Sequence, residues 1–345
     1  MKNLVMVASI VLAAGPAMAQ FLSAGTLSHV SDSSDYFSGG KESRGHIYII
    51  PNEINPESAR PIIQKAPEGV YISVGAERGI LGALQSESIT HLVQVDLVPE
   101  VVRYNQINVI LLKVSKSLSD FIQLRTADNS TAWIERAGSA ALNPQEREIL
   151  KNHLNHDFYV KVEGAARERL ISPDFFVGSS YLKDESLFNK ARNMALSGHI
   201  QVLQGNLMDQ NLLKGLAAEL AQKGLSISVV DLSNAWEPKY VGPQGVDTIV
   251  SALEPALRPD SIVMGTSVAH CFESHLCRWD FRGFTFRMLK SAKLIYGKYA
   301  PMSDLFLKKD AIKPNSVLSR WEFIKLAVSA RPDRPIVACE KVFLK

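Results

Sequence analysis

The strongest constraint on the fold of this chain is an apolar strand that ends in a glycine turn and is followed by a second strand with a carboxylate at its end. Residues 69–79 read GVYISVGAERG, and residues 91–96 read HLVQVD. This order is typical of sheets that hold a nucleotide-like ligand over their first two strand ends. We therefore expect Gly75, Gly79 and Asp96 to lie close together at one edge of a sheet.

The alternation of strand and helix continues through much of the chain. Strands that alternate with helices predict an α/β fold with a doubly wound, mostly parallel sheet and helices on both of its faces. Pro99 fits the first turn of the second predicted helix, where its missing N–H loses no hydrogen bond. Strands are predicted at residues 70–74, 91–97, 199–206, 225–232 and 261–268, and helices at 79–84, 99–112, 210–223, 246–257 and 321–330.

The chain is long enough for one large domain with an insertion. It has 345 residues, of which 46% are hydrophobic. Residues 114–198 break the alternation with helical or irregular sequence, and residues 143–146 (NPQE) have the form of a capping box at a helix start. We predict an N-terminal extension at residues 20–68 and one domain at residues 69–345, with a helical insertion at about 114–198.

The N-terminus has the composition of a signal peptide at residues 1–19. Lys2 precedes an apolar run, and Ala17 and Ala19 stand at the two positions that a signal peptidase reads. Cleavage before Gln20 predicts an exported protein, periplasmic or extracellular. The apolar run is about half of the roughly 20 residues that span a bilayer, so we expect no permanent membrane span after signal removal. The alternative is an ordinary buried strand or helix.

The charge balance gives no reason to expect nucleic acid as a partner. Lys and Arg number 38 against 35 Asp and Glu, and the formal net charge is +3. Nucleic-acid binding depends on a basic surface that neutralises phosphates. The sequence has no block of Lys and Arg, so we predict a small-molecule ligand instead.

The glycine turn and the following carboxylate suit a ligand that carries hydroxyl groups. Glycine at Gly75 permits a positive φ and a close approach of a ligand to the backbone. The helix that follows presents free N–H groups. The Asp96 carboxylate can accept hydrogen bonds from two ribose hydroxyls. The alternatives are a simple turn at Gly75 and a helix-capping role for Asp96 ahead of Pro99.

Four segments resemble the ordered motifs of class I S-adenosylmethionine-dependent methyltransferases. They are residues 74–79 (VGAERG), 95–102 (VDLVPEVV), 203–207 (LQGNL) and 230–237 (VDLSNAWE). The resemblance implies a Rossmann-like sheet of seven strands whose last strand is antiparallel, and residues 335–344 are the candidate for that strand. It also implies S-adenosylmethionine as the cofactor, with an acceptor that the sequence leaves unknown.

The same resemblance assigns roles to individual residues. Gly75, Ala76, Glu77 and Gly79 would lie against the methionine part of the cofactor, and Asp96 with Leu97 at the ribose. Asn206 and Leu207 would lie at the adenine, and Asp231 would line the wall shared by cofactor and substrate. The candidates for a catalytic role on that wall are Asn234, Trp236 and Glu237, although Trp236 fits a core tryptophan equally well. No metal is predicted.

Three positions depart from the motif pattern of this family. Glu77 stands where the family usually has Gly, Asn206 stands where it usually has an acid, and Asn234 is not followed by the Pro-Pro-aromatic run of amino-group methyltransferases. Two hypotheses therefore stay open. The protein is either an exported methyltransferase-like protein that binds S-adenosylmethionine, or an exported binding protein that retains the fold without the chemistry.

Two further alternatives rest on other patterns. A nicotinamide cofactor needs G-x-G-x-x-G, whereas the chain has Gly75, Gly79 and Gly82 at a different spacing. Residues 270–277 (HCFESHLC) follow a strand and hold two His and two Cys. They are compatible with a zinc site, a Cys271–Cys277 disulfide or neither, and a metal-dependent hydrolase centred on His270 and His275 is the third functional hypothesis.

Overall fold

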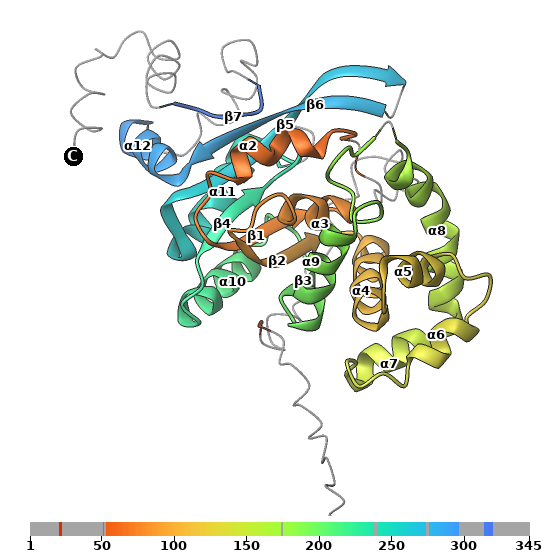
Figure 1. Cartoon of the computed structure of the whole chain (residues 1–345). Coiled ribbons are helices and arrows are strands. Elements are labelled where there is room, and N and C mark those ends of the chain that lie inside the picture. Colours follow the sequence, from red (N-terminus) through yellow and green to blue (C-terminus); the bar gives the residue numbers. More distant parts are fainter. Residues whose placement is uncertain are drawn as a thin grey trace, which may run out of the picture.

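A seven-stranded sheet runs through the computed structural model in the order β3-β2-β1-β4-β5-β6-β7 (Figure 1). The structure describes residues 21–22, 51, 53–173, 175–237, 241–273, 276–296 and 314–319. The first five strands in this order are parallel, β6 is antiparallel to β5, and β7 is parallel to β6. The strands are β1 (Gly69–Val74), β2 (Ile89–Asp96), β3 (Ile200–Gln204), β4 (Ile227–Asp231), β5 (Leu257–Glu273), β6 (Leu276–Thr285) and β7 (Ser316–Val317).

Both faces of the sheet are covered by helices, as the alternation predicts. Successive side chains of a strand point to opposite faces. Tyr71 accordingly packs with one core cluster while Val70 and Ile72 pack with the other. The first cluster includes residues of η2 (Pro56–Ala59), α2 (Arg60–Ile63), α3 (Glu77–Ala83), α4 (Pro99–Val114) and α9 (Glu185–Leu196). The second includes residues of α10 (Gln210–Gln222), α11 (Gly242–Leu253), η3 (Glu254–Ala256) and α12 (Phe286–Tyr296).

This arrangement confirms the predicted α/β fold with a mostly parallel, doubly wound sheet. Parallel strands covered on both faces are apolar almost throughout, and every residue of β4 is buried. β1 pairs with β2 on one side and with β4 on the other. The carboxyl ends of β1, β2 and β4 therefore lie at the same edge of the sheet, where ligands of such folds bind.

The described part of the segment that the sequence marks as an insertion contains α9 near its end and four helices before it. These four are α5 (Leu118–Arg125), α6 (Thr131–Arg136), α7 (Pro144–Lys151) and α8 (His153–Ile171), and they gather on the side of α4 (Figure 1). The capping box at the start of α7 is confirmed: Asn143 accepts from the Glu146 amide, and Glu146 accepts from the Asn143 amide. The predicted domain boundaries themselves stay a prediction.

Two described strands, β6 and β7, run opposite to the first five, because β6 is antiparallel to β5 and β7 is parallel to β6. β6 follows β5 directly and pairs with it from Ile262 opposite Thr285 to Glu273 opposite Leu276. Two strands joined by a short connection pair as an antiparallel hairpin, because a parallel pair needs a long crossover. The predicted strand at 335–344 and the predicted helix at 321–330 lie outside the described residues, as does the predicted signal peptide.

The long β5–β6 hairpin also contains most of the segment with two His and two Cys. The backbone register places Cys271 opposite Cys277. His275 lies outside the described residues. Among the residues that the structure describes, no group of three or more His, Cys, Asp or Glu side chains is arranged to hold a metal ion. No described helix combines the length and apolarity needed to cross a bilayer.

Candidate functional site

The glycine turn opens directly off the end of β1. Gly75 has a φ of 80°, a conformation that L-residues rarely adopt, and a Cβ built on it would meet no atom of the described residues within 4 Å. The described part of the chain therefore leaves the space beside this turn open. Gly79 has a different role, because its Cβ would lie 3.0 Å from the side chain of Gln94 on β2. Gly79 thus allows α3 to pack closely on the sheet.

We expect Gly75→Ala to lower the free energy of unfolding by about 1–2 kcal/mol, because alanine is strained at this positive φ even though space is available. The matched control is Gly215→Ala inside α10, where a Cβ also meets nothing within 4 Å. That change is expected to raise stability by up to about 1 kcal/mol, since alanine is the better helix former. Urea unfolding of both variants measures the difference, and equal effects would contradict the assigned strain.

Asp96 links the ends of β1 and β2. Its Oδ2 accepts a hydrogen bond from the Gly75 amide at 3.0 Å, and its Oδ1 accepts from the Val98 amide at 2.9 Å. Asn105 donates to the Gly75 carbonyl at 3.0 Å. Burial raises the pKa of the Asp96 carboxyl to about 6, although the backbone N–H groups oppose the shift. The carboxylate therefore holds the turn and ionises close to neutral pH.

The carboxyl end of β3 lies beside that of β2, at the same edge of the sheet. The Gly205 amide donates to the Asp96 carbonyl at 2.9 Å, and Asn206 Oδ1 accepts from the Met208 amide at 2.8 Å. Gly75, Asp96 and Asn206 are all partly exposed, and we call these three residues the carboxyl-edge row. Leu97 is also partly exposed.

Ala76 and Leu207 contribute packing beside the row. Both are buried. The Ala76 carbonyl accepts from Gln94 at 2.7 Å, and Leu207 belongs to the second core cluster. The structure thus brings the residues of the carboxyl-edge row together, whereas the side chains of Ala76 and Leu207 are buried in the protein.

The tip of β4 is closed by a buried ionic cluster around Arg78, which had no predicted role. Arg78 donates from Nε and Nη2 to both carboxylate oxygens of Asp231, at 3.0 and 2.8 Å. Its Nη1 lies 2.5 Å from Glu53 Oε1. The members of this Arg78 cluster are Glu53, Tyr71, Arg78, Asp231, Ser233 and Thr266.

The other hydrogen bonds in the Arg78 cluster join its two carboxylates, Glu53 and Asp231, to further members of the same cluster. The Tyr71 hydroxyl and the Ser233 amide donate to Asp231 at 2.6 and 3.0 Å. The Ser233 hydroxyl donates to Glu53 Oε1 at 2.8 Å, and the Thr266 hydroxyl donates to the same oxygen at 3.3 Å. Every member is buried, and the two carboxylates raise the pKa of Arg78 against the opposing effect of burial. Asp231 is therefore committed to an internal pair.

The three catalytic candidates after β4 differ in exposure. Trp236 is buried in the second core cluster and donates to the Thr266 carbonyl at 2.8 Å, as expected for a core tryptophan. Asn234 and Glu237 are partly exposed. Asn234 accepts from the Glu237 amide at 3.0 Å through its carbonyl. These contacts supply no activated acid, base or nucleophile.

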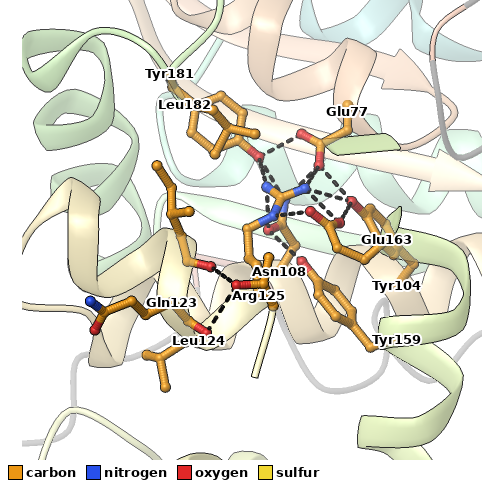
Figure 2. A network of polar contacts seen from close by, with 12 residues as sticks. Glu77, Tyr104, Asn108, Gln123, Leu124, Arg125, Tyr159, Glu163, Tyr181 and Leu182 are labelled. Atoms are coloured by element: carbon orange, nitrogen blue, oxygen red, sulfur yellow. Dashed lines mark hydrogen bonds and ion pairs between the residues drawn. The ribbon is translucent and has the colours of Figure 1, made fainter. Parts of the chain in front are cut away.

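Glu77 points into the protein, toward the guanidinium of Arg125 (Figure 2). Its side chain is 0% exposed, and Oε1 receives Arg125 Nη2 at 2.7 Å. The Tyr181 hydroxyl donates to Oε2 at 2.5 Å, and the Tyr104 hydroxyl lies 2.7 Å from Oε1. The charge that sets Glu77 apart from the usual glycine is thus paired with Arg125 of the insertion, and no described atom lies within 4 Å of the Cβ position of Gly75.

Arg125 is the centre of this second buried cluster. It binds Glu163 through Nε and Nη2, both at 2.7 Å, in addition to Glu77. Figure 2 shows the side chains converging from the sheet domain and from the insertion. Burial raises the pKa of Glu163, while Arg125 opposes that shift. We call this the Arg125 cluster; it consists of Glu77, Tyr104, Asn108, Arg125, Tyr159, Glu163 and Tyr181.

Two hollows on the described part of the chain lie away from the carboxyl-edge row. One, of about 750 Å³, is lined by residues of α9, by Glu87 and by His199. The other, of about 370 Å³, lies at the end of α4. Neither is lined by Gly75, Asp96 or Asn206.

Comparisons with known proteins give a matching family model and remote similarity to solved structures. A family model described as "Domain of unknown function (DUF7790)" matches residues 48–272, which is more than half of the chain. No curated protein matches in sequence. A solved structure titled "rRNA methyltransferase aviRa from Streptomyces viridochromogenes" is similar, with 16% identity, a TM-score of 0.32, and coverage of 74% of this chain and 88% of that one. At this TM-score the similarity carries no argument, and the fold rests on the sheet described above.

Proposed function

The chain belongs to the DUF7790 family, and since this family has no assigned activity, we propose a function from the site itself. We propose that the protein binds S-adenosylmethionine or a related nucleoside at the carboxyl-edge row. The observation that carries the proposal is the Gly75 turn, beside which no described atom fills the Cβ position, bonded to Asp96, a partly exposed residue.

Each member of the row offers a chemical group that suits a nucleoside. The Asp96 carboxylate has about four lone-pair sites. The backbone bonds from Gly75, Leu97 and Val98 do not use all of them, so the carboxylate can also receive a ribose hydroxyl. Asn206, at the tip of β3, carries a side-chain amide, a group that suits the polar edge of a base. At Gly75 a ligand can approach the backbone without meeting a side chain.

Titration calorimetry on the folded protein tests this proposal. We expect binding heat with S-adenosylmethionine or S-adenosylhomocysteine, and a loss of at least about tenfold in affinity in Asp96→Ala, in line with the loss of hydrogen bonds to a charged group. Asp260→Ala is the matched control, because Asp260 is an exposed acid on β5 with an ion pair to Arg258. No heat with either ligand in folded protein would refute the proposal.

The raised pKa of Asp96 predicts how binding depends on pH. With a pKa of about 6, the carboxylate is ionised at about pH 8 and mostly protonated at about pH 5, so affinity should fall about tenfold over this range. Calorimetry at both values measures the fall. In Asp96→Asn the affinity should be weak and should not change through this titration; an unchanged affinity in the unmodified protein would contradict the prediction.

The raised pKa of Asp96 also makes the free energy of unfolding depend on pH, in the direction opposite to that of ligand affinity. Because the folded-state pKa lies above the ordinary value of 3.8, the contribution of Asp96 to stability is fully present below about pH 4 and is lost as the pH rises through about 6. Ligand affinity and intrinsic stability should therefore change in opposite directions.

A second candidate function is binding without group transfer. It is favoured by the Arg78 cluster, in which Arg78 and Asp231 are buried and bonded to each other beside the row. No group there is free to act on an acceptor. Incubation with methyl-labelled S-adenosylmethionine and a cell extract distinguishes the two functions: binding without label transfer supports this candidate, and transfer that Asp96→Ala abolishes contradicts it.

We further propose that the protein is exported. The support is the signal-like sequence at residues 1–19. Phe21 packs edge-on against His91 at a centroid distance of 4.8 Å, and Leu22 is buried in the second core cluster, so a cut before Gln20 would keep both packing residues. Mass spectrometry of the protein from a periplasmic or extracellular fraction should show Gln20 as the first residue; an intact N-terminus in the cytoplasm would contradict export.

A further inference from the structure

The hollow at the end of α4 is lined by an excess of cationic side chains. Its volume is about 370 Å³, and its walls come from the end of α4, from α6 and the loop after it, and from α9. Four cations and one acid line it: Lys113, Lys116, Arg136, Arg192 and Glu135.

Much of the hydrogen-bonding capacity of these cations is unused. Lys113 binds Glu146 at 2.5 Å and Arg136 binds Asp120 at 2.7 Å. A guanidinium has five N–H donors and an ammonium has three. Each of these two cations thus keeps donors that its carboxylate partner does not take.

Two of the cations have no acidic partner among the described residues. Arg192 uses only Nε, which donates to the Ser115 carbonyl at 2.6 Å. The ammonium of exposed Lys116 has no bond or ion pair to any described residue. Even when Asp120, Glu135 and Glu146 are counted against the four cations, the group retains a positive charge.

We propose that this hollow binds a phosphate-type oxyanion. Arg192 and Arg136 present the planar donor forks that suit a tetrahedral oxyanion, and the two lysines add charge from the same walls. The site is separate from the carboxyl-edge row and does not depend on the function proposed for it. The simpler reading is that Arg192 only caps the carboxyl end of α4, where a helix attracts cations.

Thermal unfolding and calorimetry with inorganic phosphate separate these readings. At constant ionic strength set with sodium chloride, phosphate should raise the melting temperature, and Arg192→Gln should weaken phosphate binding at least about tenfold, equivalent to about 1.4 kcal/mol. Lys116→Gln should weaken it without destabilising the fold, since that exposed side chain makes no contact to lose. Methyl phosphate in place of phosphate tells whether an ester is accepted.

The control is Lys151→Gln on α7, which removes one positive charge from a side chain that is 53% exposed and paired with Glu148. It should leave phosphate binding unchanged. No phosphate-dependent shift in the unmodified protein, or an equal shift in Lys116→Gln, Arg192→Gln and Lys151→Gln, would overturn the proposal and leave only the capping role.

Discussion

Arg125→Met is expected to lower the free energy of unfolding by about 3–5 kcal/mol, because it leaves two carboxylates buried without a counter-charge. Arg125 is the guanidinium that binds both Glu77 and Glu163, and side-chain exposure is 2% or less for all three residues. Urea unfolding at neutral pH, followed by circular dichroism, measures the loss.

The control for this prediction is Arg258→Met. Arg258 forms its ion pair with Asp260 at 3.5 Å and is 49% exposed, so its removal is expected to change stability by at most about 1 kcal/mol. The triple variant Arg125→Met, Glu77→Gln, Glu163→Gln should recover much of the loss, since the uncompensated charges are gone. A loss in Arg125→Met no larger than in Arg258→Met would contradict the role of Arg125 as the counter-charge of two buried carboxylates.

Arg78→Met is expected to have an effect of the same size, about 3–5 kcal/mol, for the same reason at a different place. It leaves Glu53 and Asp231 buried at the tip of β4, where Arg78 binds both. Thermal and urea unfolding measure the loss, with Arg258→Met again as the control.

The double variant Arg78→Met, Asp231→Asn tests whether the loss comes from the unpaired acid. It should be more stable than Arg78→Met alone, because one of the two buried charges has been removed. If the double variant is less stable by the sum of two independent losses, the contact between Arg78 and Asp231 is not the source of the effect.

The Arg125 cluster and the Arg78 cluster support different parts of the proposed function. The Arg125 cluster takes the Glu77 carboxylate away from the glycine turn and so favours an accessible row. The Arg78 cluster uses the polar groups of the β4 tip internally and so favours binding without transfer. The prediction that nucleic acid is not a partner stays a prediction.

Much of the fold could be predicted because its signals are local. Apolar strands, a glycine turn, Pro99 at a helix start and the capping box of α7 each involve residues within a few positions of one another. β6 could also have been found, because residues 278–284 (RWDFRGF) alternate in the way that strands do. Residues 335–344, the candidate that the family resemblance suggests for an antiparallel strand, lie outside the described residues.

The sequence by itself determined the carboxyl-edge row, since strand order and the rule that parallel strands end at one edge suffice to bring Gly75 beside Asp96. Only the tertiary structure decided where the charges inside the protein go. Arg78 meets Asp231 across 153 positions, and Tyr181 meets Glu77 across 104. Which distant side chain bonds to a buried charged group depends on how the helices and strands pack, and the spacing of residues along the chain does not reveal that packing.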